Sequence, residues 1–190
     1  MPVGTKSGFG SLDPALMLPT SQRQILCNFL GNFNGHRGAA IETMKRRGLK
    51  CHVQLKKGFG ASGVKVIDYR NLLRESRFTL TPWGANYETF RFYEALEAGS
   101  IPIFQRLPQQ WDHKRSPFNA LGPDCPIPQF ESWDKAADFI LELQKKSDNE
   151  LDQLQKTIVD FWMNFKLKTQ QDIRETIDAS FRKAHKCDSC

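Results

Sequence analysis

Short apolar runs alternate with helically spaced apolar residues between residues 24 and 104 of the chain. Strands are predicted where apolar runs end at glycine or polar residues, at 24–31, 51–55, 77–81 and 101–104. Helices are predicted between them, at 37–47, 66–75 and 87–98. Strands that alternate with helices through short connections predict an α/β fold, a parallel sheet with helices on its faces.

The remainder of the chain adds an irregular start and a helical end. Residues 1–22 are rich in Gly, Pro and Ser and predict an irregular N-terminal segment. A further strand and three helices are predicted at 127–130, 133–145, 148–168 and 171–184. We therefore expect one domain over 23–184 that includes C-terminal helices, followed by a polar tail at 185–190.

The net charge of the chain has two interpretations. The 190 residues include 27 Lys and Arg against 21 Asp and Glu, a formal net charge of +6. Such a charge favours phosphorylated or polyanionic partners, and it is equally typical of a basic solubilising surface. The basic residues are scattered, with no basic tract interleaved with aromatic residues, so we expect no nucleic-acid partner.

The cysteine pattern indicates whether a disulfide framework or a zinc site is present, and the apolar stretches indicate whether the chain crosses a membrane. The odd, low count of five cysteines is not typical of a disulfide framework. Cys187 and Cys190 form a CxxC pair that would need two more zinc ligands, with His185 the nearest, so we interpret it as part of a solvated tail. No DxD motif is present, and we expect no metal. No apolar stretch is long enough for a membrane span or a signal peptide, which by itself predicts a cytoplasmic protein.

Residues 77–104 combine a strand, a turn, a helix and a second strand in a way that suggests chemistry. In an open parallel sheet, ligands bind beyond the carboxyl ends of the strands, and the free N–H groups of a helix start suit a phosphate. Arg91 adds a bidentate cationic donor, and Glu94 lies on the same helix face and could accept both hydroxyls of a ribose. The same spacing is equally typical of an ion pair on a solvated helix.

This segment resembles the signature of the exostosin family of glycosyltransferases. The signature joins a strand ending in Pro-x-Gly, a helix with Ser/Thr-x-Arg and a Glu three residues later, and a Gly-x-x-Pro-Val/Ile strand. The matching residues here are Pro82, Gly84, Thr89, Arg91, Glu94, Gly99, Pro102 and Ile103. The similarity covers nearly everything after residue 22, including the Asp68-Tyr69 pair, and extends to family members that transfer xylose.

The resemblance implies a role for the chain and for particular residues. The family has a GT-B fold of two Rossmann-like domains, and this chain is similar to the C-terminal, donor-binding one. Arg91 would contact the donor diphosphate, Glu94 the ribose, and Arg37 the phosphates, while Gly31 and Asn32 would line the loop before Arg37. Pro82, Gly84 and Thr89 would complete the donor site. The implied donor is a UDP-sugar, UDP-xylose in particular, transferred with inversion to a glycan, glycoprotein or ribitol-phosphate acceptor without a further cofactor.

Two parts of such an enzyme are not seen in this sequence. One is the N-terminal domain that is expected to hold the acceptor and the catalytic base, so no catalytic residue is assigned. The other is the membrane anchor typical of these enzymes of the Golgi lumen. The sequence therefore predicts either the donor half of a transferase whose acceptor domain lies outside this chain, or a non-catalytic module that binds a nucleotide sugar.

Three features near the expected site have two interpretations each. Trp83, in the Pro-x-Gly turn, either stacks on a nucleobase or packs against the sheet. His36 lies in the loop before the first helix, where it either serves the phosphate site or is simply exposed. Residues 56–63, with three glycines and two lysines, either close over a donor or form an ordinary mobile loop. By contrast, Phe161, Trp162 and Phe165 recur at helical spacing and predict core packing.

Overall fold

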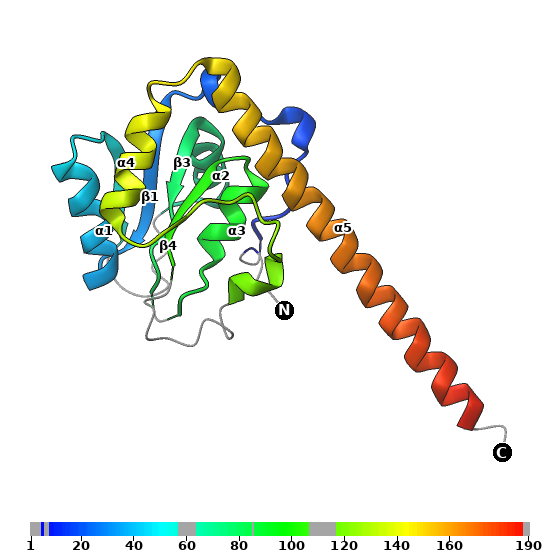
Figure 1. Ribbon diagram of the computed structural model, residues 1–190. Helices are drawn as coiled ribbons and strands as arrows, with labels where there is room; N and C mark the ends of the chain where they lie inside the picture. The colour runs from blue at the N-terminus through cyan, green and yellow to red at the C-terminus, as the bar shows by residue number, and fades with distance from the viewer. Residues whose placement is uncertain (1–4, 6–7, 57–63, 85, 107–116, 188–190) are drawn as a thin grey trace.

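Parallel strands form a single twisted sheet in the computed structural model, which describes residues 5, 8–56, 64–84, 86–106 and 117–187 (Figure 1). The strands lie in the order β2-β1-β3-β4-β5. Their bounds are Ile25–Asn32 (β1), Cys51–Lys56 (β2), Ser76–Leu80 (β3), Ile101–Gln105 (β4) and Gln129–Phe130 (β5). The predicted Rossmann-like parallel sheet is confirmed, and each strand lies within two residues of its predicted bounds.

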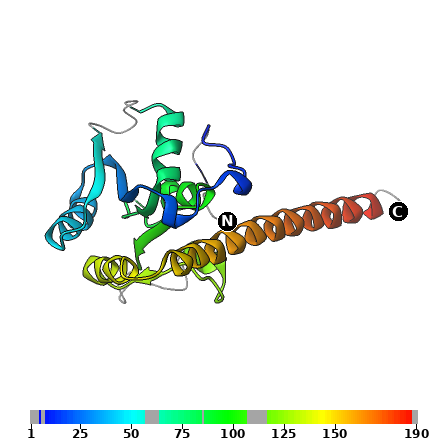
Figure 2. The same ribbon diagram turned by 90° about the horizontal axis from the view of Figure 1, so that it is seen from above.

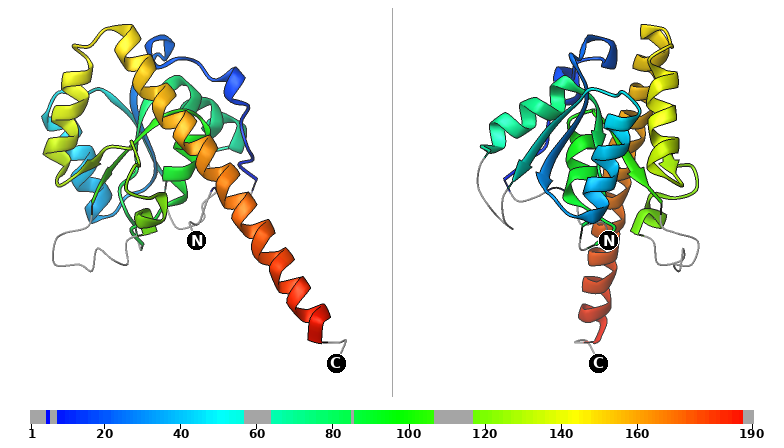
Figure 3. Two further views of the ribbon diagram at one scale, coloured as in Figure 1. Left: turned by 45° about the vertical axis from the view of Figure 1, so that its right-hand side comes forward. Right: turned by 90° about the vertical axis from the view of Figure 1, so that its left-hand side faces the viewer.

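Helices cover both faces of this sheet. The bounds are Gly35–Arg46 (α1), Val66–Glu75 (α2), Phe90–Glu97 (α3), Trp133–Leu143 (α4) and Asp148–Cys187 (α5). Short 3-10 segments are η1 (Pro14–Leu16), η2 (Thr20–Gln22) and η4 (Pro117–Leu121). Figures 2 and 3 show α1 and α4 on one face and α2 and α3 on the other. Because both faces are covered, the central strands are continuous apolar runs rather than alternating ones.

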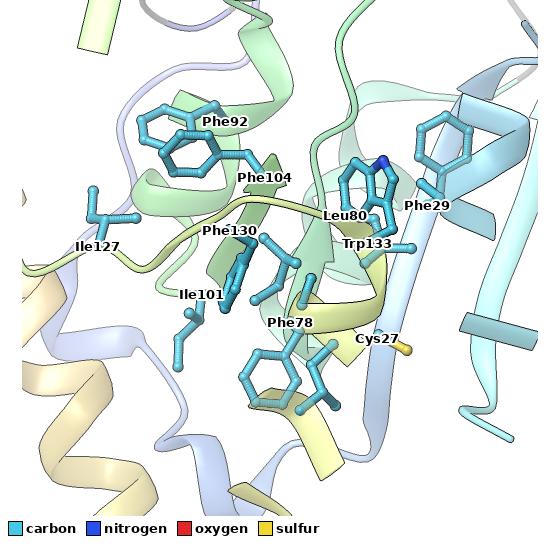
Figure 4. Packing of buried hydrophobic residues seen from close by; sticks show 14 of the residues in the cluster. Cys27, Phe29, Phe78, Leu80, Phe92, Ile101, Phe104, Ile127, Phe130 and Trp133 are labelled. Atoms are coloured by element: carbon cyan, nitrogen blue, oxygen red, sulfur yellow. The ribbon is translucent and has the colours of Figure 1, made fainter. Parts of the chain in front are cut away.

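The core lies between the sheet and its helices and is dominated by aromatic rings. Figure 4 shows Phe92 of α3 beside Phe104 of β4, with ring centroids 5.1 Å apart. Phe118 of η4 packs against both rings. The next residue of α3, Tyr93, contacts Trp162 of α5, which is 5% exposed. The core role predicted for Trp162 is therefore confirmed.

The long helix α5 differs from the prediction of two helices over 148–168 and 171–184. It is one continuous helix of 40 residues. The region around Gln171 contains no Gly or Pro, and the Thr169 hydroxyl donates to the Phe165 carbonyl within the same helix, so no stop signal ends it there. The first half of α5 packs on α3, and its second half projects away from the domain (Figure 1).

A buried arginine joins the N-terminal segment to the sheet. The Arg23 side chain is 1% exposed and donates hydrogen bonds to the carbonyl oxygens of Leu18, Leu73, Ser76 and Ala98. Burial lowers the pKa of Arg23 to about 10. The Leu18 carbonyl belongs to a loop, those of Leu73 and Ser76 to the end of α2, and that of Ala98 to the end of α3. A single guanidinium group therefore connects three segments on one side of the sheet.

A disulfide joins Cys27 of β1 to Cys51 of β2, which the low, odd cysteine count did not lead us to expect. The parallel register places these two residues directly opposite each other, and their Cα atoms are 4.5 Å apart. That distance is within the range a disulfide requires. Cys125 is a free thiol, and Cys190 of the CxxC pair lies outside the described residues.

Removal of the disulfide is expected to destabilise the domain. The bond closes a loop with a sequence separation of 24 residues, and a loop of that length corresponds to about 3.5 kcal/mol of unfolding free energy. Urea unfolding of Cys27→Ala/Cys51→Ala should show this loss, whereas Cys125→Ala, which removes a free thiol, serves as the control. Equal midpoints for the double variant and wild type would show that the disulfide does not stabilise the fold.

Candidate functional site

The strand order reverses between β1 and β3, and the predicted donor residues lie where these two strands end. From β1 the chain passes through α1 on one face to β2, and from β3 it passes through α3 on the other face to β4. Such a reversal opens a crevice at the carboxyl ends of the strands, where ligands of open α/β sheets bind. Gly31 and Asn32 end β1, and Pro82 and Gly84 follow β3 at this edge.

Helices α1 and α3, which follow β1 and β3, begin at different residues from those predicted. Helix α1 starts at Gly35, and the Asn34 side chain caps it by accepting a hydrogen bond from the Arg37 N–H. Helix α3 starts at Phe90 with Thr89 as N-cap, three residues later than predicted. The delay arises because the turn after β3 continues: the Gly84 N–H donates to the Asn86 carbonyl. Within the described residues, the buried Thr89 hydroxyl has no hydrogen-bond partner.

Arg91 is held against the end of β1 from the first turn of α3. Its Nε and Nη2 atoms donate to the Leu30 carbonyl oxygen at 3.0 and 2.5 Å. The guanidinium group lies over the Phe29 ring, 4.8 Å from its centroid. A Cβ atom at Gly31 would lie 2.6 Å from Nη2, so only glycine leaves room for this placement. The Arg91 guanidinium group is therefore held at the end of β1 by backbone and ring contacts.

Arg37 brings a second guanidinium group to the same edge from α1. Its Nη1 donates to the Asn32 carbonyl oxygen at 3.1 Å, and its Nη2 would be 2.6 Å from a Cβ atom at Gly84. The Nε of Arg37 is buried and, in the part of the chain that the structure describes, has no hydrogen-bond partner. Burial and the nearby charge of Arg91 lower the pKa of Arg37. Two like charges thus share one small region.

Glu94 lies one helical turn after Arg91 and is 5% exposed. This burial excludes the alternative of an ion pair on a solvated helix. The Tyr69 hydroxyl of α2 donates to Glu94 Oε2 at 3.0 Å. Burial holds the pKa of Tyr69 well above its usual range, with Arg91 opposing the shift and Glu94 adding to it. The sequence pattern did not single out Tyr69 as a site residue; its only signal was the Asp68-Tyr69 pair in the family resemblance.

Three aromatic rings stack beside the two arginines. The Trp83 indole lies between His36, with ring centroids 3.4 Å apart, and Tyr87, at 4.4 Å. Because both of its faces are covered, Trp83 presents no open face to a base. The stack joins the first turn of α1, which carries Arg37, to the turn before α3, the helix that carries Arg91.

The structure also has a hollow at the opposite end of the sheet. It is lined in part by Gln24, Lys50 and His52 and lies at the amino ends of β1 and β2, away from the arginines. Among the described residues there is no group of three His, Cys, Asp or Glu side chains that could hold a metal ion. Residues 57–63, the loop that was considered as a closing element, lie outside the described ranges.

Comparison with known proteins gives one family match that spans most of the chain. Residues 7–182 match the family described as "RXYLT1 C-terminal domain". This confirms the predicted similarity to the C-terminal domain of a xylosyltransferase. A crystal structure of an alpha1,3-fucosyltransferase aligns over 76% of this chain and 46% of its own, at a TM-score of 0.45 and 18% identity, which is too weak a similarity to carry an argument.

Curated relatives agree with the family match. Ribitol-5-phosphate xylosyltransferase 1 of Homo sapiens is 25% identical over 94% of this chain, and that of Mus musculus is 26% identical over 94%. The protein of the same name from Danio rerio is 24% identical over 95% of the chain. The alignments cover 43–44% of these relatives, so the chain spans less than half of their length.

The two glycines at the crevice provide a test of the arginine geometry. A methyl group at Gly31 would displace the guanidinium end of Arg91 and lie 3.1 Å from the Phe29 ring, whereas one at Gly84 would displace the guanidinium end of Arg37. We expect Gly31→Ala and Gly84→Ala to fold normally and to bind pyrophosphate about tenfold less tightly, since a charge-assisted hydrogen bond contributes about 1.5–3 kcal/mol. Calorimetric titration measures this.

Gly35→Ala is the matched control, because a Cβ atom at Gly35 meets nothing within 4 Å and its backbone conformation suits any residue. It should bind pyrophosphate as wild type does. If Gly31→Ala and Gly84→Ala also bind as Gly35→Ala does, the two guanidinium groups do not form the anion site.

Proposed function

Because the chain belongs to the RXYLT1 C-terminal domain family, we propose that it is the donor-binding domain of a glycosyltransferase and that it binds a UDP-sugar. The observation that carries the proposal is the convergence of Arg37 and Arg91 at the reversal of strand order. Two like charges this close to each other are stabilised by a bound anion. A diphosphate supplies several oxygens for two bidentate guanidinium groups at once.

The neighbouring groups suit the other parts of a nucleotide. The starts of α1 and α3 direct backbone N–H groups to the same edge as the arginines, which favours a phosphate there. Gly31, Asn32 and Thr89 line this edge, and Thr89 supplies a buried hydroxyl. Glu94 would accept hydrogen bonds from the ribose hydroxyls. A nucleoside diphosphate carries its ribose next to its phosphates, as Glu94 lies next to Arg91.

Binding of the diphosphate would also serve catalysis. In transfer with inversion, an acceptor hydroxyl attacks the anomeric carbon of the sugar while the bond from that carbon to the phosphate oxygen breaks. Negative charge develops on the departing UDP, and Arg37 and Arg91 would stabilise it with groups already in place. The names of the curated relatives support xylose as the sugar, and hence UDP-xylose as the donor.

The acceptor and the catalytic base are proposed to belong to another part of the protein. The curated relatives are more than twice as long as the aligned region, which leaves room for an acceptor domain. The acceptor would be a glycan, a glycoprotein or a ribitol phosphate. The alternative is a non-catalytic module, which would bind the same donor and transfer nothing even when a complete acceptor is supplied.

The disulfide supports a location in the secretory pathway. Disulfides form and persist in oxidising compartments and are rare in the cytosol. The Cys27–Cys51 bond is therefore what we would expect of a domain in the Golgi lumen. Within the described ranges, no helix is long and apolar enough to cross a membrane. Recovery of the Cys27 and Cys51 peptides as separate free thiols from cells that express the protein would contradict this location.

Calorimetric titration with UDP tests the proposed donor site. We expect wild type to bind UDP, and Arg37→Ala and Arg91→Ala to bind it at least tenfold less tightly, because each loses charge-assisted hydrogen bonds worth about 1.5–3 kcal/mol. Arg46→Ala makes the same change in charge on α1, at an exposed residue paired with Asp134, and should bind UDP as wild type does.

The pattern across these variants separates a specific site from general charge attraction. Equal losses in Arg46→Ala and Arg37→Ala would mean that UDP responds only to net charge. No binding of UDP by wild type would overturn the proposed function. Binding of UDP and UDP-xylose without transfer by the full-length protein, with acceptor present, would favour the non-catalytic alternative.

A further inference from the structure

The hydrogen bond between Tyr69 and Glu94 joins two helices on the same face of the sheet. Tyr69 is in the first half of α2, and Glu94 is in the middle of α3, 25 residues later in the chain. The donor and acceptor oxygens are 3.0 Å apart. Because burial raises the pKa of Tyr69, its hydroxyl keeps its proton and remains a donor over the whole physiological range.

A hydrogen bond of this kind sets the direction of the carboxylate. The last torsion of a glutamate side chain has a broad energy profile, so an unsupported carboxylate rotates over a wide range. The contact from Tyr69 to Oε2 restricts that rotation, and Glu94 is too deeply buried for water to replace the contact freely. The lone pairs of the carboxylate therefore point in fixed directions.

Arg91 completes the group and links it to the anion site. Its charge acts on the Tyr69 hydroxyl as well as on Arg37, so Tyr69 is close to the same positive region. Tyr69 also interacts with the Arg91 guanidinium group, which is held in addition by two hydrogen bonds to the Leu30 carbonyl. Removal of the Tyr69 hydroxyl should therefore change the direction of Glu94, while these two hydrogen bonds keep Arg91 against β1.

We propose that Tyr69 is a positioning residue that directs the Glu94 carboxylate at the ribose hydroxyls, and that the site thereby selects ribonucleotides over 2′-deoxyribonucleotides. This rests on the proposed function, since it takes a nucleoside diphosphate as the ligand. Tyr69 itself does not touch the nucleotide. Its effect should appear only in ligands that differ at the ribose.

The test compares UDP with 2′-deoxyUDP, which have the same base and the same diphosphate. Wild type should bind UDP about tenfold more tightly, since a hydrogen bond to a charged group contributes about 1.5–3 kcal/mol. Tyr69→Phe keeps the ring and loses the hydroxyl, and its preference should fall to about threefold or less through weaker binding of UDP alone. Glu94→Gln should show a similar loss, and the double variant should lose no more than Glu94→Gln.

Tyr93→Phe is the matched control. The Tyr93 hydroxyl also donates to a glutamate, Glu88, so this variant loses the same kind of hydrogen bond from α3 without affecting Glu94. It should keep the preference of wild type. A partly unfolded variant weakens the apparent binding of both ligands by the same factor, so the ratio of the two affinities is still valid.

The outcomes separate the two levels of the proposal. If wild type binds UDP and Tyr69→Phe keeps the full preference for it, Tyr69 does not position Glu94, although the donor site stands. If wild type binds UDP and 2′-deoxyUDP equally tightly, the proposed contact between Glu94 and the ribose hydroxyls is wrong. If wild type binds neither, the proposed function fails and this inference with it.

Discussion

The reversal of strand order between β1 and β3 is the constraint on which the candidate site depends. Connections from these neighbouring strands leave on opposite faces of the sheet, so α1 and α3 both begin at the same edge but approach it from different sides. Arg37 in the first turn of α1 and Arg91 in the first turn of α3 consequently meet at that edge. No short stretch of sequence brings them together; the topology does.

The surrounding structure holds these charges in place before any ligand arrives. Arg91 is bound to the Leu30 carbonyl, and Gly31 leaves the space that this contact requires. The far end of α3 is fixed by α5, since Glu97 accepts hydrogen bonds from Trp162 and Lys166. A site whose donors are already oriented loses little free energy to reorganisation when an anion binds, which is the condition for strong electrostatic stabilisation.

The sequence predicted those features that depend on local periodicity. Buried parallel strands are continuous apolar runs, and β1, β3 and β4 were therefore visible as such. The i, i+3 spacing placed Arg91 and Glu94 on one face of a helix, although only the burial of Glu94 decided between a site residue and a solvated ion pair.

Features that depend on contacts across the fold were not predictable in this way. The role of Tyr69 requires α2 and α3 to be neighbours, and the disulfide requires the register that sets Cys27 opposite Cys51. The late start of α3 follows from a hydrogen bond from the Gly84 N–H to Asn86 within the turn before it. Helix propensity and capping signals contain none of this information.

A crystal structure of the chain with UDP would show whether the two arginines bind the diphosphate. We expect the diphosphate to lie at the carboxyl ends of β1 and β3, with oxygens within hydrogen-bond distance of both the Arg37 and Arg91 guanidinium groups. UDP bound elsewhere, for example in the hollow beside Lys50 and His52 at the opposite end of the sheet, would contradict it.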